Sequence, residues 1–132
     1  VQRSSTPRTA QARGSQRAAS FRLRPSGILK TLRAGRTAYS AKAASLVKGV
    51  DLLYHETTYS MRDAVNAKGR GHSTTHDAAK VALKAEAGRL IIGHFSSRYK
   101  SDVEALAEEC REIFPNTDIA TEGACFTIEE QR

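Results

Sequence analysis

The chain has 132 residues, enough for one small domain or for part of a larger one. It is 39% hydrophobic and 27% charged, a balance that allows a buried core. No apolar run is long enough to span a bilayer, no signal-peptide h-region follows the basic N-terminus, and two cysteines are too few for a disulfide framework. These features exclude membrane-spanning and disulfide-rich secreted proteins and predict a cytoplasmic protein with free cysteines.

The net charge of +7 is distributed unevenly along the chain. Residues 1–36 contain nine Lys or Arg and no acidic residue, whereas residues 37–132 contain twelve basic and all fourteen acidic residues. The first segment has little apolar bulk and no sustained hydrophobic period, so burial cannot offset the entropy of ordering it. We therefore predict a basic, largely disordered segment over 1–36 and a folded domain over 37–132.

Two interpretations of the basic segment follow from its composition. It can be an arm that contacts nucleic acid phosphates, or a tail with no selected role. The arginines have no periodic placement, and they are not interleaved with aromatic residues, since Phe21 is the single aromatic residue of the segment. This favours the second interpretation.

The predicted elements begin just after the basic segment. Ser40 is placed to cap a helix through Val47, with Gly49 as its C-terminal stop. The apolar run 50–54 predicts a buried strand that ends before His55-Glu56-Thr57-Thr58. A short helix over 61–68 and a polar loop over 69–74 follow.

The remaining elements alternate in the same way. Thr74 and Asp77 have capping-box spacing before a helix to about residue 87, and Ser101 and Glu104 have the same spacing before a helix that ends at Pro115. A buried strand is expected over 89–93, between these helices. Two short strands are expected after the second helix, over 118–121 and 125–129. Strands alternating with helices predict a layered α/β domain.

Three polar clusters stand at the ends of these elements, and each carries one histidine. They are YHETT at 54–58, GHSTT at 71–75 and HFSSRY at 94–99. Loops at strand ends are common places for active sites in α/β proteins, and histidine both ligates zinc and transfers protons near neutral pH. A single histidine after a strand is nevertheless more often structural. The fourth, His76, is expected at the surface of a helix start.

Two further residues in these clusters have both a functional and a structural interpretation. The Arg98 guanidinium matches phosphate oxygens, but it can equally form a salt bridge. Glu56, beside His55, can act in acid–base chemistry or can be a solvated carboxylate at a strand end.

The clusters and their surroundings resemble a known family. VDLLYHETTY, GHSTTHDAA, RLIIGHFSSRY and FPNTDIATEG resemble, in order and spacing, the C-terminal half of ribonuclease Z, from about Thr37 to Glu129. The resemblance implies the C-terminal portion of a metallo-β-lactamase αββα sandwich. It also implies a zinc-dependent endoribonuclease that trims the 3′ end of precursor tRNA and forms homodimers.

The resemblance assigns roles to residues of this chain. His94 matches a ligand of one of two zinc ions, and Glu56 and His72 match a pair that gives a proton to the departing 3′ oxygen. The substrate phosphates are expected near Arg98, Ser73 and Thr74.

The chain also departs from the family pattern. The family's HxHxDH metal motif does not occur, and Arg36 stands where the bridging aspartate is expected. We therefore expect residues 1–36 not to be family sequence, and the chain alone to bind zinc poorly and to be an inactive fragment. The alternative is a non-catalytic RNA-binding protein that uses its basic N-terminal arm.

Overall fold

The computed structural model describes residues 9–11, 20–23, 29–32 and 41–128, with side chains from residue 41 onward. Within these ranges, seven strands form two sheets, of order β1-β2-β7 and β3-β4-β5-β6. The strands are β1 (Thr9–Gln11), β2 (Ser20–Leu23), β3 (Leu29–Leu32), β4 (Leu52–Glu56), β5 (Arg89–Gly93), β6 (Thr117–Ile119) and β7 (Cys125–Ile128). The helices are α1 (Ala41–Leu46), α2 (Ala64–Arg70), α3 (Thr75–Lys84) and α4 (Val103–Arg111), with short 3-10 helices η1 (Met61–Asp63) and η2 (Ser97–Tyr99).

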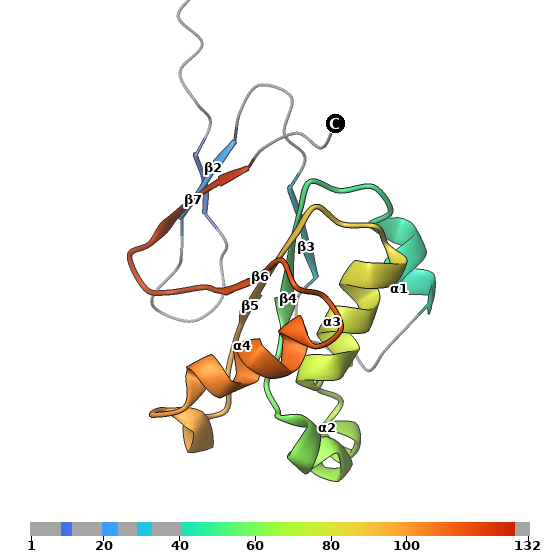
Figure 1. Cartoon of the computed structure of the whole chain (residues 1–132), viewed down its shortest axis with the longest axis vertical. Coiled ribbons are helices and arrows are strands. Elements are labelled where there is room, and N and C mark those ends of the chain that lie inside the picture. Colours follow the sequence, from blue (N-terminus) through green and yellow to red (C-terminus); the bar gives the residue numbers. More distant parts are fainter. Residues whose placement is uncertain (1–8, 12–19, 24–28, 33–40, 129–132) are drawn as a thin grey trace, which may run out of the picture.

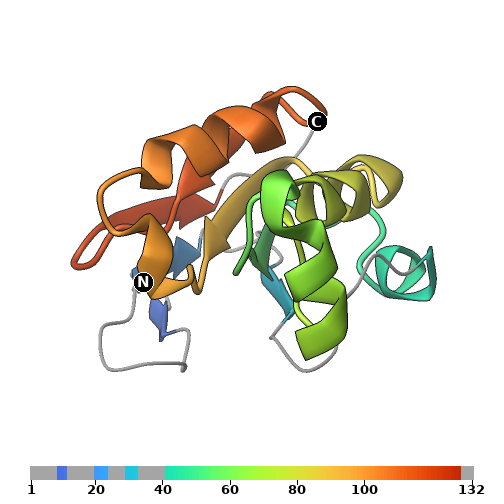
Figure 2. The same cartoon turned by 90° about the horizontal axis from the view of Figure 1, so that it is seen from below.

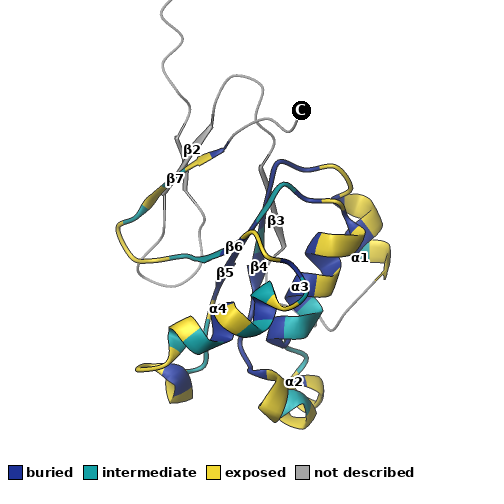
Figure 3. Ribbon diagram, viewed as in Figure 1, coloured by how far each residue is buried: buried dark blue, intermediate teal, exposed yellow. Residues whose placement is uncertain are grey.

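The four-stranded sheet is entirely parallel, and it positions the polar clusters. In its central pair, Leu52 of β4 is opposite Arg89 of β5, and Glu56 is opposite Gly93. Both strands are buried almost throughout, as expected for a parallel sheet covered on two sides (Figure 3). The register therefore brings the residues that follow β4 and β5 to one edge of the sheet.

Helices cover one face of this sheet, and the second sheet approaches the other (Figure 1; Figure 2). On the helix side, Leu53, Leu90 and Ile92 pack with Val81 of α3 and Leu106 of α4 in the main core. On the opposite side, Leu52 and Ile91 pack with Ile128 of β7 in a smaller core. The result is a helix layer followed by two β layers, as expected for part of an αββα sandwich.

The connection between β6 and β7 joins the two β layers. Thr121 and Ala124 are linked by a backbone hydrogen bond of 3.0 Å, with Gly123 at a φ of 75°. The two strands are neighbours in the sequence, yet they belong to different sheets. The pairing partner of β7 is β2, which lies in the basic segment.

The structure confirms some of the predicted elements and corrects others. The strand over 89–93 is confirmed, and so is the capping box of Thr74 and Asp77. The second predicted box is wrong, because α4 begins after Asp102 without a side-chain cap. The basic segment contributes three short strands that its composition did not predict, and the rest of that segment lies outside the described residues. Ser40, the predicted cap of the first helix, also lies outside them.

Two further observations bear on the class of protein. Both cysteines are free; Cys110 is buried in the main core, and Cys125 is exposed on β7. Burial, with a smaller contribution from Glu109, raises the pKa of the Cys110 thiol to about 12. None of the helices within the described ranges is long and apolar enough to cross a membrane.

Candidate active site

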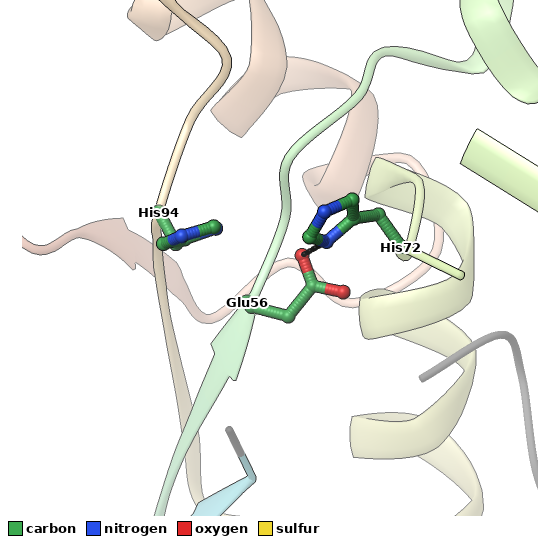
Figure 4. Close-up of side chains that lie close together, drawn as sticks. All are labelled: Glu56, His72 and His94. Atoms are coloured by element: carbon green, nitrogen blue, oxygen red, sulfur yellow. Dashed lines mark ion pairs between the residues drawn. The ribbon is translucent and has the colours of Figure 1, made fainter. Parts of the chain in front are cut away.

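Three side chains from separate segments meet at the C-terminal edge of the parallel sheet. Glu56 ends β4, His94 directly follows β5, and His72 lies in the loop before α3 (Figure 4). One potential ligand atom from each of the three lies within 4.8 Å of the others. The strand register explains why Glu56 and His94 are close, since Glu56 is opposite Gly93 and His94 is the next residue.

The loop that carries His72 is fixed by the end of α2. Gly71 adopts a left-handed φ of 70°, and its backbone N–H closes the helix onto Ala67 and Lys68. The N–H of His72 then donates to the Ala67 carbonyl at 2.9 Å. A bridge between Tyr59 and Thr74 ties this loop to the segment after β4.

The Glu56 carboxylate is buried, and hydrogen bonds hold it in place. Its side chain is 1% exposed, Oε1 accepts from the Ser73 N–H at 2.6 Å, and Oε2 accepts from the Thr58 N–H at 3.1 Å. The Thr58 hydroxyl lies 2.6 Å from the same Oε2, and His72 Nδ1 lies 3.8 Å from it. Glu56 is therefore buried and held by hydrogen bonds, and it is not the solvated strand-end residue of the structural interpretation.

Thr58 is a central residue that the sequence did not single out. Its hydroxyl lies within hydrogen-bonding distance of Glu56 Oε2, of His94 Nδ1 at 3.0 Å and of His72 Nδ1 at 3.4 Å. Sequence spacing gave no signal for this contact, because the two histidines are 14 and 36 residues away.

His94 has an unusual backbone conformation. Its φ is 59°, in the left-handed region that costs a non-glycine residue roughly 1 kcal/mol or more. The preceding residue, Gly93, leaves no room for a side chain, because a Cβ there would collide with the Tyr54 ring. Strained backbone of this kind is often found at functional sites, where the surrounding structure holds it in place.

Ser73 and Thr74 support the loop from within. Ser73 is 0% exposed and Thr74 is 3% exposed. The Ser73 N–H holds Glu56, and the Thr74 side chain caps α3 by accepting from the Asp77 N–H. These contacts favour a role in shaping the site over direct contact with substrate phosphates.

Arg98 lies at the side of the site and is already partnered. Its Nη1 lies 3.1 Å from Asp63 Oδ1, and its guanidinium carbon lies 5.4 Å from the centre of the Tyr59 ring. The Arg98 side chain is 44% exposed. Thus the salt bridge and the phosphate role are compatible, since a guanidinium has five N–H donors.

Glu109 of α4 holds together the elements behind the site. It accepts from the Ser60 hydroxyl at 2.6 Å, from the Thr75 hydroxyl at 2.5 Å and from the Met61 N–H at 3.1 Å. Partial burial opposes ionisation of Glu109, but these three donors outweigh it and hold the pKa of its carboxyl below the ordinary value.

The other two histidines lie outside the group formed by Glu56, His72 and His94. His55 is 1% exposed, and burial lowers its pKa, although its Nδ1 lies 2.6 Å from the Glu56 carbonyl oxygen. His76, expected at the surface, is half-buried, with Nε2 3.3 Å from Glu112 Oε2.

The donors of the group suit a divalent transition metal. Two imidazoles and one carboxylate are ligands that zinc and similar ions accept. The group contains three residues, and the imidazole rings of His72 and His94 are 5.7 Å apart between their centres. These three residues could therefore hold a metal ion at this edge of the sheet.

Sequence comparison relates the chain to named nucleases. Ribonuclease Z of Bacteroides thetaiotaomicron is 45% identical over 92 residues, which are 70% of this chain and 29% of that protein. Ribonuclease BN of Erwinia tasmaniensis is 46% identical over 93 residues, which are 70% of this chain and 31% of that protein. The chain thus spans about 30% of the length of these relatives.

Structural comparison identifies the fold. The metallo-beta-lactamase fold protein YhfI from Bacillus subtilis aligns with a TM-score of 0.58 and 16% identity, covering 80% of this chain and 38% of that one. No family model matches the chain. Over 70% of its length, the chain is related by sequence to ribonuclease Z, and it has part of a metallo-β-lactamase fold.

Proposed function

We propose that this chain is the C-terminal part of a zinc-dependent endoribonuclease that trims the 3′ end of precursor tRNA, and that it is inactive alone. The observation that supports this most directly is the meeting of Glu56, His72 and His94 within 4.8 Å. The family resemblance gives roles to these same three residues, and the relatives carry the names ribonuclease Z and ribonuclease BN.

In this proposal, His94 supplies one ligand to a zinc ion, and the other ligands come from a region that this chain lacks. The HxHxDH motif does not occur in the sequence, and Arg36 cannot bridge two cations. A zinc ion held there would supply Lewis-acid chemistry, which activates water and polarises the phosphodiester.

Glu56 and His72 would supply the proton to the departing 3′ oxygen. Glu56 Oε2 and His72 Nδ1 are 3.8 Å apart, close enough for a small shift of the imidazole to bring them into hydrogen-bonding contact. Burial of Glu56 keeps this carboxylate away from water. Arg98, half exposed beside the pair, would contact a substrate phosphate with its remaining donors.

The proposed partners are precursor tRNA and a second copy of the chain, and the proposed location is the cytoplasm. The names of the relatives support an RNA substrate. Exposed apolar side chains on α1 and α3, Leu46 and Leu83, support self-association.

Reconstitution tests this function. In buffer that contains zinc, the chain is incubated with precursor tRNA bearing a 3′ trailer, alone and with the part of the Bacteroides thetaiotaomicron relative that this chain does not match. We expect no cleavage by the chain alone and cleavage at the trailer by the mixture. Zinc content is measured in both samples, and it should be low in the chain alone.

Variants connect any cleavage with the site. Glu56→Gln and His72→Asn should each reduce cleavage by the mixture about 100-fold or more, since general acid–base groups typically contribute that much. His76→Asn is the control, because its partner Glu112 lies away from the group. Equal activity of all three variants would refute the roles, and cleavage by the chain alone would refute its incompleteness.

A further inference from the structure

The side chain of Thr58 contacts all three members of the site, Glu56, His72 and His94. Its hydroxyl lies 2.6 Å from Glu56 Oε2, 3.0 Å from His94 Nδ1 and 3.4 Å from His72 Nδ1. The residue is only 7% exposed, so water competes little for these contacts. A hydroxyl has one hydrogen to donate and two lone pairs that accept.

The carboxylate decides the direction of these hydrogen bonds. Its contact is the shortest of the three, and both carboxylate oxygens already accept from backbone N–H groups, so the Thr58 hydrogen goes to Glu56. The backbone N–H of Thr58 donates to the same oxygen at 3.1 Å, which fixes the carboxylate against this residue. The hydroxyl oxygen is then left as an acceptor toward both imidazoles.

We propose that Thr58 is a positioning residue that sets the tautomer of His94 and His72. Each imidazole donates an Nδ1–H to the Thr58 oxygen and so presents Nε2 with its lone pair free. A metal-ligating histidine commonly donates its other ring N–H to such a partner, which fixes the ring and the ligating nitrogen. The assignment of His94 as a zinc ligand rests on the proposed function, whereas the proposed tautomer rests only on the contacts of Thr58.

The neighbouring residue provides a matched control. Thr57 is 0% exposed, and its hydroxyl has no hydrogen-bond partner among the described residues. Thr57→Val and Thr58→Val therefore make the same chemical change in adjacent buried positions. Only the second change removes a hydroxyl that contacts the site. Thr58→Ser keeps the hydroxyl and should rescue.

Nitrogen-15 NMR of the metal-free full chain measures the tautomers directly, at mildly alkaline pH where imidazole is normally neutral. His94→Gln and His72→Asn assign the two signals. We expect Nδ1–H on both rings in the unmodified chain, in Thr57→Val and in Thr58→Ser. In Thr58→Val, the His94 ring should change to Nε2–H or to a mixture.

Two results would overturn the inference. One is Nε2–H on His94 in the unmodified chain, a result that needs no variant to fold. The other is Nδ1–H in Thr58→Val as strongly as in Thr57→Val. Because these spectra need neither zinc nor RNA, they can fail while the proposed nuclease function stands.

A second measurement follows the metal. In the reconstituted mixture, Thr58→Val should lower zinc affinity about 10-fold to 100-fold, as loss of a partner behind a ligand commonly does, while Thr58→Ser and Thr57→Val stay near the unmodified value. Unchanged affinity in Thr58→Val would contradict positioning of the ligand. Absence of zinc from every mixture would instead count against the proposed function.

Discussion

At the scale of single residues, the end of β5 is the most constrained point of the site. Gly93 lies against the Tyr54 ring, and His94 has a left-handed φ of 59°. The first residue admits no side chain, and the second accepts a strained backbone to place its imidazole beside Thr58. The position of His94 therefore depends on the residue before it.

Gly93→Ala tests this dependence. The added Cβ would collide with the Tyr54 ring, which packs against the core of Leu52, Ile91 and Ile128. We expect the free energy of unfolding to fall by about 1–3 kcal/mol, the usual cost of overpacking, as measured by urea denaturation.

Gly69→Ala is the matched control for this substitution. Gly69 lies in α2, and a Cβ there meets nothing within 4 Å. Alanine in a helix should leave stability unchanged or raise it by about 0.5–1 kcal/mol. Equal losses in the two variants would show that the contact with Tyr54 is not the cause.

At the scale of elements, α4 carries the residue that joins the segments behind the site. Glu109 accepts hydrogen bonds from Ser60 and Met61, at the start of η1, and from Thr75, at the start of α3. A helix on one side of the core thus holds the two loops that carry the polar clusters.

Glu109→Gln should lower the free energy of unfolding at pH 7 by about 1–3 kcal/mol, because hydrogen bonds to a charged group are lost. The pKa of Glu109 is lowered in the folded chain, so its stabilisation is present above the ordinary glutamate pKa and is lost as the pH falls through the folded value. The difference between the two proteins should therefore shrink in urea titrations at about pH 4.

Glu108→Gln provides the comparison on the same helix. The Glu108 side chain is 65% exposed and pairs with Arg111 at the surface, where an ion pair contributes less than about 1 kcal/mol. A Glu109→Gln effect that is the same at both pH values, or no larger than that of Glu108→Gln, would contradict the role of the carboxylate.

The elements also show what sequence patterns determine. Hydrophobic runs and caps predicted β5 and the start of α3, because these depend on residues close in sequence. The strand predicted over 50–54 lies instead over Leu52–Glu56, because pairing with β5 sets its limits. This shift makes Glu56 a strand residue.

Other features depend on contacts that no local pattern records. The predicted helix over 61–68 divides into η1 and α2, with Ser60 capping the first. The last two strands join different sheets, although only five residues separate them. Thr58 was missed for the same reason, since its partners come from three segments.

At the scale of the whole molecule, the described residues present one helix layer and open sheet edges. β6 ends one sheet and β7 ends the other. Leu46 and Leu83 are 69% and 56% exposed near the C-terminal ends of α1 and α3, where the Gly49 N–H donates to the Ala85 carbonyl at 2.8 Å. Exposed apolar side chains on adjacent helices favour association.

We therefore expect the chain to self-associate, with a mass by light scattering above the 14.4 kDa of one copy. The double variant Leu46→Ser/Leu83→Ser should shift the mass toward one copy. Val65→Ser is the control, because Val65 is also apolar and exposed but lies on α2, at the end of α3 away from α1 (Figure 1). A mass of one copy for the unmodified chain at all concentrations would contradict this expectation.

The two free thiols differ in exposure, and this difference can be used to measure local opening of the fold. Cys125 is exposed on β7, whereas Cys110 is buried and its Sγ–H donates to the Thr75 carbonyl at 3.3 Å. A thiol reagent therefore modifies Cys125 in the closed molecule and reaches Cys110 only when α4 separates from α3. The rate at which Cys110 is modified therefore measures how readily the helix layer behind the site opens.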